Sequence, residues 1–308
     1  VKITAGTDSQ SGVAKTTYTL SGATSQTETT ITSGNTITIS AEGTTTITAY
    51  TYDGAGNKSD GKSLSVKKDT VAPTFSNIYY IENVTSALVQ FYATDNNGID
   101  KVTMSGNYNE TKSTENNTTK SLRCQMLIST DGKTVVTIKD LAGNTATKTH
   151  NIKFLYQYND KRTSTTGGWL TNYFRNVYGD IEGIAYYDNG SLQIVASSVT
   201  NGQGRVGTWY TANAIDLTQY DTIRTVTNVR NGSNALVTLA TPDGYLDSAD
   251  SANDTRREEN GDGNWYYIRL KGDISKINSG KQIILGTYGS QDKTINFLFY
   301  NCYIYSFK

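Results

Sequence analysis

Six aromatic residues in the second half of the chain have the side-chain type and the setting needed to bind sugars. They adjoin Gly, Asn or Asp at positions typical of loops: Trp169, Tyr186, Tyr187, Trp209, Tyr210 and Tyr245. Sugar rings stack on exposed Trp and Tyr faces, while nearby polar groups bond the hydroxyls. A structural role in a core or at an edge is the alternative for Trp169 and Trp209, and it is favoured. Trp265 in "NWYYIRL" alternates like a core strand residue and is expected to be structural.

An acidic segment from 243 to 264 has the composition of a calcium site. It carries seven carboxylates, opposed only by Arg256 and Arg257. Calcium binds six to eight oxygens, often from carboxylates, although the spacing here differs from an EF-hand. A solvated, mobile loop explains the same composition and is favoured. The candidate ligands of a structural calcium ion are Asp243, Asp247, Asp250 and Asp254, and no other cofactor is expected.

Three further patterns could indicate catalysis, and each has a simpler explanation. The segment "GQGRVG", from Gly202 to Gly207, matches a dinucleotide fingerprint, but "TWYTANAIDLT" follows where a helix is needed, so a flexible β-loop is expected. His150 is the only histidine, which argues against a metal site or a His-dependent triad; we expect a solvent-facing strand residue. Paired carboxylates would suit a glycosidase, but after residue 150 the Glu residues are only Glu182, Glu258 and Glu259. We therefore expect no enzyme.

The amino-acid composition predicts the type of secondary structure that must position these residues. Of 308 residues, 36% are hydrophobic and 18% are charged, while Thr, Ser, Asn, Gly and 22 Tyr are abundant. Thr and Tyr favour strands, so the prediction is an all-β protein. The zero net charge and the absence of basic clusters argue against nucleic-acid binding. No apolar run approaches the roughly 18 residues of a membrane span. Cys124 and Cys302 are expected to be free, buried thiols in different domains.

An internal repeat of 87 residues organises the first half of the chain. The turn "DGAGN" at Asp53 recurs as "DLAGN" at Asp140, and Asp8 and Asp95 have the same 87-residue separation. Strand-like stretches flank both turns, which indicates a domain-sized sandwich repeat. With the linker "KKDTVAPT" (67–74), the repeats resemble the bacterial Ig-like modules that occur in strings on surface proteins and phage virion proteins.

The resemblance implies two Ig-like β-sandwiches, at 1–70 and 71–155. Only seven residues precede Asp8, whereas about 20 precede Asp95 in the second copy. We therefore expect the opening strand of the first copy, and further modules, upstream of Val1.

The C-terminal part, 156–308, contains all three Trp residues and no further copy of the turn. Its many strand-like runs suit an eight-stranded jelly roll. The stretch "GTWYTANAIDLTQYDTIRTV" (207–226) resembles a segment of galactose-binding-like and carbohydrate-binding jelly rolls, in which Ile-Asp-Leu-Thr ends one strand. The predicted fold is thus two Ig-like sandwiches followed by a C-terminal jelly roll.

Together these expectations predict that the chain is a non-catalytic binding protein on a cell surface or a virion. The Ig-like modules would be a stalk, and the jelly roll would contact glycans or a host cell-surface receptor. The alternatives are a structural spacer, in which the Tyr-rich end "FLFYNCYIYSF" packs in an oligomer, and accessory modules of a carbohydrate-active enzyme.

Overall fold

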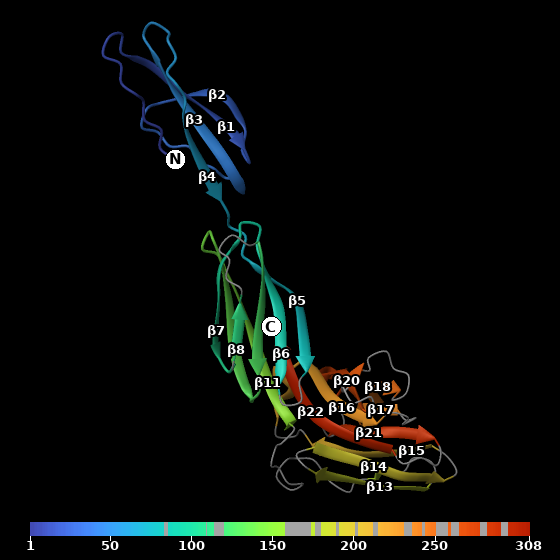
Figure 1. Cartoon of the computed structure of the whole chain (residues 1–308). Helices are drawn as coiled ribbons and strands as arrows, with labels where there is room; N and C mark the ends of the chain where they lie inside the picture. The colour runs from blue at the N-terminus through green and yellow to red at the C-terminus, as the bar shows by residue number, and fades with distance from the viewer. Residues whose placement is uncertain are drawn as a thin grey trace.

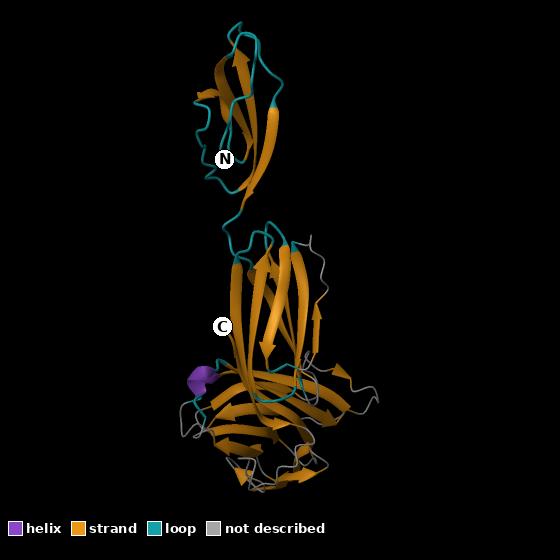
Figure 2. Ribbon diagram, turned by 90° about the vertical axis from the view of Figure 1, so that its left-hand side faces the viewer, coloured by secondary structure: helices purple, strands orange, loops and turns teal. Residues whose placement is uncertain are grey.

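The computed structural model describes residues 1–82, 86–108, 110–113, 120–157, 174–175, 180–188, 191–200, 203–211, 215–230, 236–241, 244–250, 258–259, 265–277, 282–290 and 295–308. The described residues form an all-β protein, with strands and loops almost throughout (Figure 2). Three units follow one another in an elongated molecule: a first unit (1–68), a second unit (74–157) and a C-terminal unit (174–308) (Figure 1). None of the helical segments described here has the length and apolar character needed to cross a bilayer.

The first unit is a four-stranded antiparallel sheet with a small core. Its strands β1 (Val13–Gly22), β2 (Gln26–Ile31), β3 (Gly43–Asp53) and β4 (Lys62–Lys68) lie in the order β2-β1-β3-β4. Ile3, Leu20 and Ile47 form its buried centre. The strands are rich in Thr, whose branched side chain fits a pleated, half-buried surface.

The second unit packs two sheets face to face. One sheet has the order β5-β6-β9-β8, with β5 (Thr74–Glu82), β6 (Ala87–Thr94), β8 (Glu110–Ser113) and β9 (Ser121–Ile128). The facing sheet contains β7 (Ile99–Gly106), β10 (Gly132–Asp140) and β11 (Thr145–Gln157). Buried and partly exposed residues alternate along β6, as the two-residue period of a strand requires. Phe91 and Met126 of one sheet and Ile138 and Ile152 of the other belong to one buried core.

The strand order repeats as the 87-residue spacing predicts. In the first unit β1, β3 and β4 lie side by side, and in the second β7, β10 and β11 do the same. The "DLAGN" turn joins β10 directly to β11, with Gly143 at φ +97°. Gly56 in "DGAGN" has φ +89°. Both conformations suit glycine, so the recurring glycine is explained by the turn.

The C-terminal unit also consists of two packed sheets. The first has the order β12-β15-β21-β17-β18. The second contains β19, β20, β16 and β22, and β14 pairs with both β22 and β13. The bounds are β12 (Phe174–Arg175), β13 (Asp180–Asp188), β14 (Ser191–Thr200), β15 (Gln203–Thr211), β16 (Thr222–Arg230), β17 (Leu236–Thr241), β18 (Gly244–Asp250), β19 (Glu258–Glu259), β20 (Trp265–Asp273), β21 (Gln282–Ser290) and β22 (Ile295–Phe307). Residues of both sheets, such as Leu239, Leu285, Ile223 and Ile268, share one core.

The last strand, β22, joins the second unit to the C-terminal unit in a single sheet. Residues 301–307 pair with β11 on one side, and most of the strand pairs with β16 on the other. Its alternating side chains serve two cores: Tyr303, Tyr305 and Phe307 belong to that of the second unit, whereas Cys302 and Ile304 belong to that of the C-terminal unit. Because every residue from 301 to 307 is buried, these residues are not available for the oligomer contact of the alternative hypothesis.

The same strand explains why the expectation for His150 was wrong. His150 has no exposed surface, since β10 and β22 flank its strand and the rings of Tyr80, Tyr305 and Phe307 pack around it. Burial lowers the pKa of its imidazole to about 3. The sequence does not reveal this environment, because Phe307 and Tyr305 come from a strand more than 150 positions away.

Two shorter predictions also change. The Ile-Asp-Leu-Thr segment does not end a strand; its last two residues begin a one-turn 3-10 helix, η1 (Leu217–Gln219), capped by Asp216. The "GQGRVG" segment is not a loop either, because Gly204 and Gly207 lie within β15 and pair with β21. The two cysteines are free and buried, as predicted, and burial raises the pKa of Cys124 to about 12.

Candidate functional site

The predicted sugar-binding residues fall largely outside what the structure describes. Trp169 is outside the described residues. Tyr186 and Tyr187 lie on β13 and Trp209 and Tyr210 on β15, but their side chains are outside the description. Tyr245, the second residue of β18, is described and is 39% exposed. The aromatic platform on these residues therefore stays a prediction.

The predicted calcium ligands are not all in a loop. Asp243 and Asp254 lie outside the described residues, while Asp247 and Asp250 belong to strand β18. Both oxygens of Asp247 accept backbone hydrogen bonds: Oδ1 from the amide of Ser248 at 2.8 Å and Oδ2 from that of Lys271 at 2.9 Å. This carboxylate tethers β18 to β20, which explains it without a metal ion. For the other three residues calcium binding stays a prediction.

A groove between the second unit and the C-terminal unit is a candidate site among the described residues, because an exposed aromatic ring and charged side chains line it. Its volume is about 310 Å³, smaller than the roughly 520 Å³ of a hollow in the first unit. Strand β5 forms one wall, and β16, β20 and β22 form the other. Its lining residues are Ile78, Tyr79, Tyr80, Asp221, Arg224, Lys271, Tyr305 and Phe307. Ligand sites often form where two units meet, and here the shared strand β22 holds both walls in place.

A β-bulge in β5 turns apolar side chains out of the sheet at this groove. The pairing of β5 with β6 shifts register between Ser76 and Tyr79, and Asn77 has φ +48°. A residue other than glycine rarely has positive φ, and a bulge redirects the side chains beside it. As a result Tyr79 is 53% exposed and Ile81 44% exposed.

The groove combines one exposed ring with a rigid floor. Tyr80 stacks on Tyr305 with ring centroids 3.9 Å apart, and burial raises the pKa of its hydroxyl well above the usual value. Arg224 spans the two units, because its Nη1 donates to the carbonyl of Tyr80 at 3.1 Å. Tyr79 is thus free to contact a ligand while Tyr80 and Tyr305 are fixed in the structure.

Charged groups beside the ring supply hydrogen-bonding capacity. Arg224 and Lys271 contribute positive charge, and Asp221 is the carboxylate of the lining. The Asp221 Oδ1 accepts from the hydroxyl of Thr222 at 2.9 Å. An aromatic ring with donors and acceptors around it can bind a polyhydroxylated ligand. A pair of carboxylates, which hydrolysis of a glycoside usually requires, is not part of this lining.

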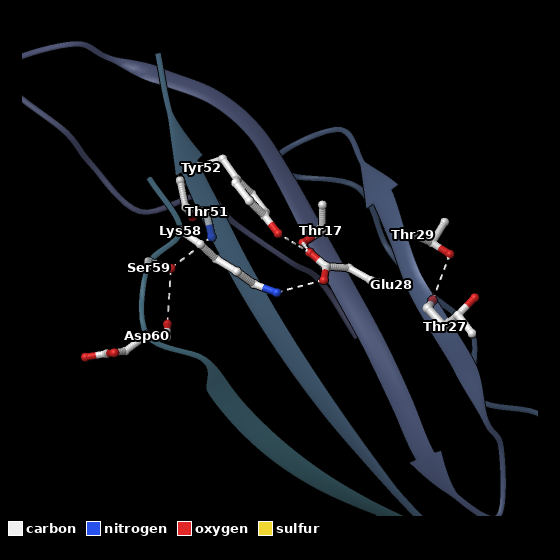
Figure 3. A network of polar contacts seen from close by, with 9 residues as sticks. All are labelled: Thr17, Thr27, Glu28, Thr29, Thr51, Tyr52, Lys58, Ser59 and Asp60. Carbon is white, nitrogen blue, oxygen red and sulfur yellow. Dashed lines mark hydrogen bonds and ion pairs between the residues drawn. The ribbon is translucent and has the colours of Figure 1, made fainter. Parts of the chain in front are cut away.

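A polar cluster in the first unit contains residue types that are common in catalytic sites, but its carboxylate is already hydrogen-bonded on both oxygens (Figure 3). Glu28 Oε1 accepts from the hydroxyls of Thr17 at 2.6 Å and Tyr52 at 2.7 Å, and Oε2 accepts from Lys58 Nζ at 2.7 Å. The hydrogen bonds from Lys58, Thr17 and Tyr52 lower the pKa of Glu28 to about 2. A carboxylate held ionised in this way is unsuited to act as a general acid or base near neutral pH. We assign it to cross-strand stabilisation of β1, β2 and β3.

Sequence reasoning missed the groove although a signal was present. "IYYI" (78–81) places four large apolar residues in succession. A strand with one buried face cannot point all four inward, so at least one must be exposed or covered by another unit. The partner wall was not predictable, because it depends on the pairing of β22 with β11.

Comparisons with known proteins leave the family open. No protein-family model and no curated protein matches the chain. A solved structure of carbohydrate-binding modules from the β-sandwich superfamily, described for their promiscuous specificity, covers 78% of this chain and 100% of its own, with 14% identity and a TM-score of 0.29. The structure of infectious bursal disease virus, Gx strain, covers 99% of this chain and 74% of its own, with 11% identity and a TM-score of 0.17. At these TM-scores neither similarity assigns a ligand.

Proposed function

We propose that this protein is a non-catalytic binding protein that contacts glycans outside the cell, on a cell surface or a virion. The first and second units act as an Ig-like stalk, and the C-terminal unit, a jelly roll, is the head. Binding uses the groove at the base of the head, with Tyr79 as the stacking ring and Asp221, Arg224 and Lys271 as hydrogen-bonding groups. No catalytic step is proposed.

The observation that carries this proposal is an exposed ring in a rigid, polar groove. Tyr79 is 53% exposed beside three charged side chains. Exposing a large aromatic side chain forgoes the free energy that its burial would contribute, about 1.5–3 kcal/mol for side chains of this size. A ligand that covers the ring would recover part of this energy. Because β22 fixes both walls, little ordering is needed on binding, which favours affinity.

A glycan array with the full chain tests the function and locates the binding surface. We expect binding to a defined set of glycans, weakened by Tyr79→Ala. Trp169→Ala and Trp209→Ala test the second surface, on the head. Binding that depends only on the two Trp residues would move the site away from the groove.

Two outcomes would overturn the proposal altogether. Absence of binding to any glycan by the folded chain would favour a structural spacer or assembly role. Turnover of a glycoside, lost on substitution of Glu182 or Asp243, would show an enzyme.

A further inference from the structure

Two cationic side chains lie side by side on the wall of the groove between the second unit and the C-terminal unit. Arg224 of β16 and Lys271 of β20 are direct partners in the antiparallel pairing of these strands, and both line the groove. Side chains that are directly opposite on antiparallel strands share one face, with Cβ atoms about 5 Å apart. Ile223 and Leu270, which precede them on each strand, belong to the core of the C-terminal unit. The two cations therefore point the other way, into the groove.

The position of this pair in the sheet leaves one of the two cations open to solvent. Tyr303, Arg224 and Lys271 form a row across β22, β16 and β20. Tyr303 is buried in the core of the second unit, Arg224 is partly buried, and Lys271, at the outer end of the row, is exposed. The row therefore runs from the core to the mouth of the groove, where a ligand can reach Lys271.

Contacts within the protein explain Arg224 but not Lys271. The Nη1 atom of Arg224 donates to the carbonyl of Tyr80 at 3.1 Å, and the guanidinium lies 5.6 Å from the centre of the Tyr80 ring. Arg224 thus ties the C-terminal unit to β5. The ion pairs of the described residues do not include Lys271. Like charges directly opposite each other destabilise a sheet, and no described ion pair of Lys271 offsets this cost.

The carboxylates around this pair are engaged elsewhere. Asp221, which also lines the groove, has its Oδ2 atom 3.8 Å from Lys308 Nζ. Asp273, at the end of β20, accepts from the amide and the hydroxyl of Ser275 at 2.9 and 2.7 Å. Asp247 accepts from two backbone amides. The described lining thus has two cations and one carboxylate, and a third cation lies beside that carboxylate, so the groove favours an anion.

We propose that the ligand of this groove is an acidic glycan, whose carboxylate or sulfate group binds between Arg224 and Lys271. This inference rests on the proposed function, glycan binding in the groove, and adds the class of sugar. Tyr79 stacks on the apolar face of the sugar ring, and the two cations bind the anionic group at its edge. A guanidinium can bind two oxygens of one anionic group, while an ammonium binds it as a point charge.

The size of the groove suits the acidic end of a glycan better than a long chain. Its volume of about 310 Å³ is at the lower end of the range for ligand pockets, roughly 300–1,000 Å³. We therefore expect an acidic sugar at or near the end of the glycan to determine the affinity.

Matched pairs of oligosaccharides test this inference with the full chain. Each pair consists of an acidic glycan and its neutral counterpart, in which the carboxyl group is reduced to an alcohol or the sulfate is removed. An exposed ion pair changes an equilibrium constant by up to about fivefold. Because two cations act here, the acidic member should bind at least about tenfold more tightly. This preference should shrink between about 0.1 and 1 M salt, since the screening length falls from about 10 to 3 Å.

Two exposed lysines of the C-terminal unit provide a matched comparison. Lys271→Gln should weaken binding of the acidic glycan about three- to fivefold and leave binding of the neutral counterpart unchanged, while Lys271→Arg, which keeps the charge, should retain the affinity. Lys276, in the 3-10 helix η2 (Ile274–Lys276), is exposed but is not part of the described lining of the groove. Lys276→Gln removes the same charge from the unit and should change neither affinity.

The outcomes separate this inference from the proposed function. Equal affinities for the acidic and neutral members, both weakened by Tyr79→Ala, would keep glycan binding and overturn the acidic ligand. A preference for acidic glycans that Lys271→Gln and Lys276→Gln reduce equally would also overturn it, because the overall charge of the unit would then explain the preference. So would equally tight binding of polyglutamate, an acidic polymer without sugar rings. Absence of binding to any glycan would overturn both proposals.

Discussion

Acidification should destabilise the second unit through His150, the only histidine in the chain. Its imidazole is fully buried, neither ring nitrogen has a hydrogen-bond partner, and burial lowers its pKa to about 3. The surrounding rings are those of Tyr80, Tyr305 and Phe307. The charged groups around these rings are Arg224, beside Tyr80, Lys148, beside Phe307, and Asp221, whose charge acts on Tyr80. None of the three forms a hydrogen bond with the imidazole, whose two nitrogens have no partner.

The size of the effect follows from the difference between the folded and unfolded pKa values. An unfolded histidine has a pKa of about 6.5, so between pH 6.5 and 3 the unfolded state binds a proton that the folded state does not. Stability is then unaffected above about pH 7 and falls by roughly 1.4 kcal/mol for each pH unit below 6.5. From pH 7.5 to pH 4.5 the free energy of unfolding should fall by about 2.5 kcal/mol on this account.

Urea unfolding of wild type and His150→Met at several pH values measures the contribution of His150 to the pH dependence of stability. The titration of other groups cancels when the free energies of unfolding of the two proteins are subtracted. The variant should lack the fall of about 2.5 kcal/mol. At neutral pH it should be at least as stable as wild type, since two unpaired buried nitrogens are removed. Parallel pH profiles for the two proteins, or an imidazole proton resonance that titrates near pH 6.5, would refute the reasoning.

Two further predictions concern the joints between units. Tyr303→Ala should lower the free energy of unfolding by about 3–5 kcal/mol, because removing a fully buried aromatic side chain leaves a cavity. Calorimetry should show that the second unit melts at a lower temperature. An unchanged melting temperature would contradict a strand shared by the two units. Asn144→Ala should cost about 1–3 kcal/mol and loosen the linker, since it leaves buried acceptors unpaired. Asn57→Ala, which loses only the side-chain hydrogen bond to Asp53 within its own turn, should not change interdomain distances in small-angle scattering.

The strand content and the repeat could be predicted because they depend on local signals. Thr- and Tyr-rich alternation and the glycine turns at Gly56 and Gly143 are readable over a few residues. The 87-residue spacing correctly predicted which strands correspond in the two copies. The turn itself was interpreted as a hairpin only. The structure adds a second role, in which Asn144 also holds the linker.

The site could not be predicted because it depends on long-range pairing. Nothing local to residues 301–307 shows that this strand inserts between β11 and β16. Without that pairing, nothing predicts that His150 is covered or that Tyr79 borders a groove. The acidic run after residue 243 led to the calcium prediction, but the sequence does not show that backbone amides of two strands hold the carboxylate of Asp247.

The most direct test of the proposed function compares two exposed side chains with the same exposed fraction. Tyr79 in the groove and Leu64 on the first unit are both 53% exposed. For a glycan identified on the array, Tyr79→Ala should raise the dissociation constant about tenfold, equivalent to roughly 1.4 kcal/mol of lost stacking. Leu64→Ala should leave it unchanged. Equal dissociation constants for the two variants and wild type would contradict glycan binding in this groove.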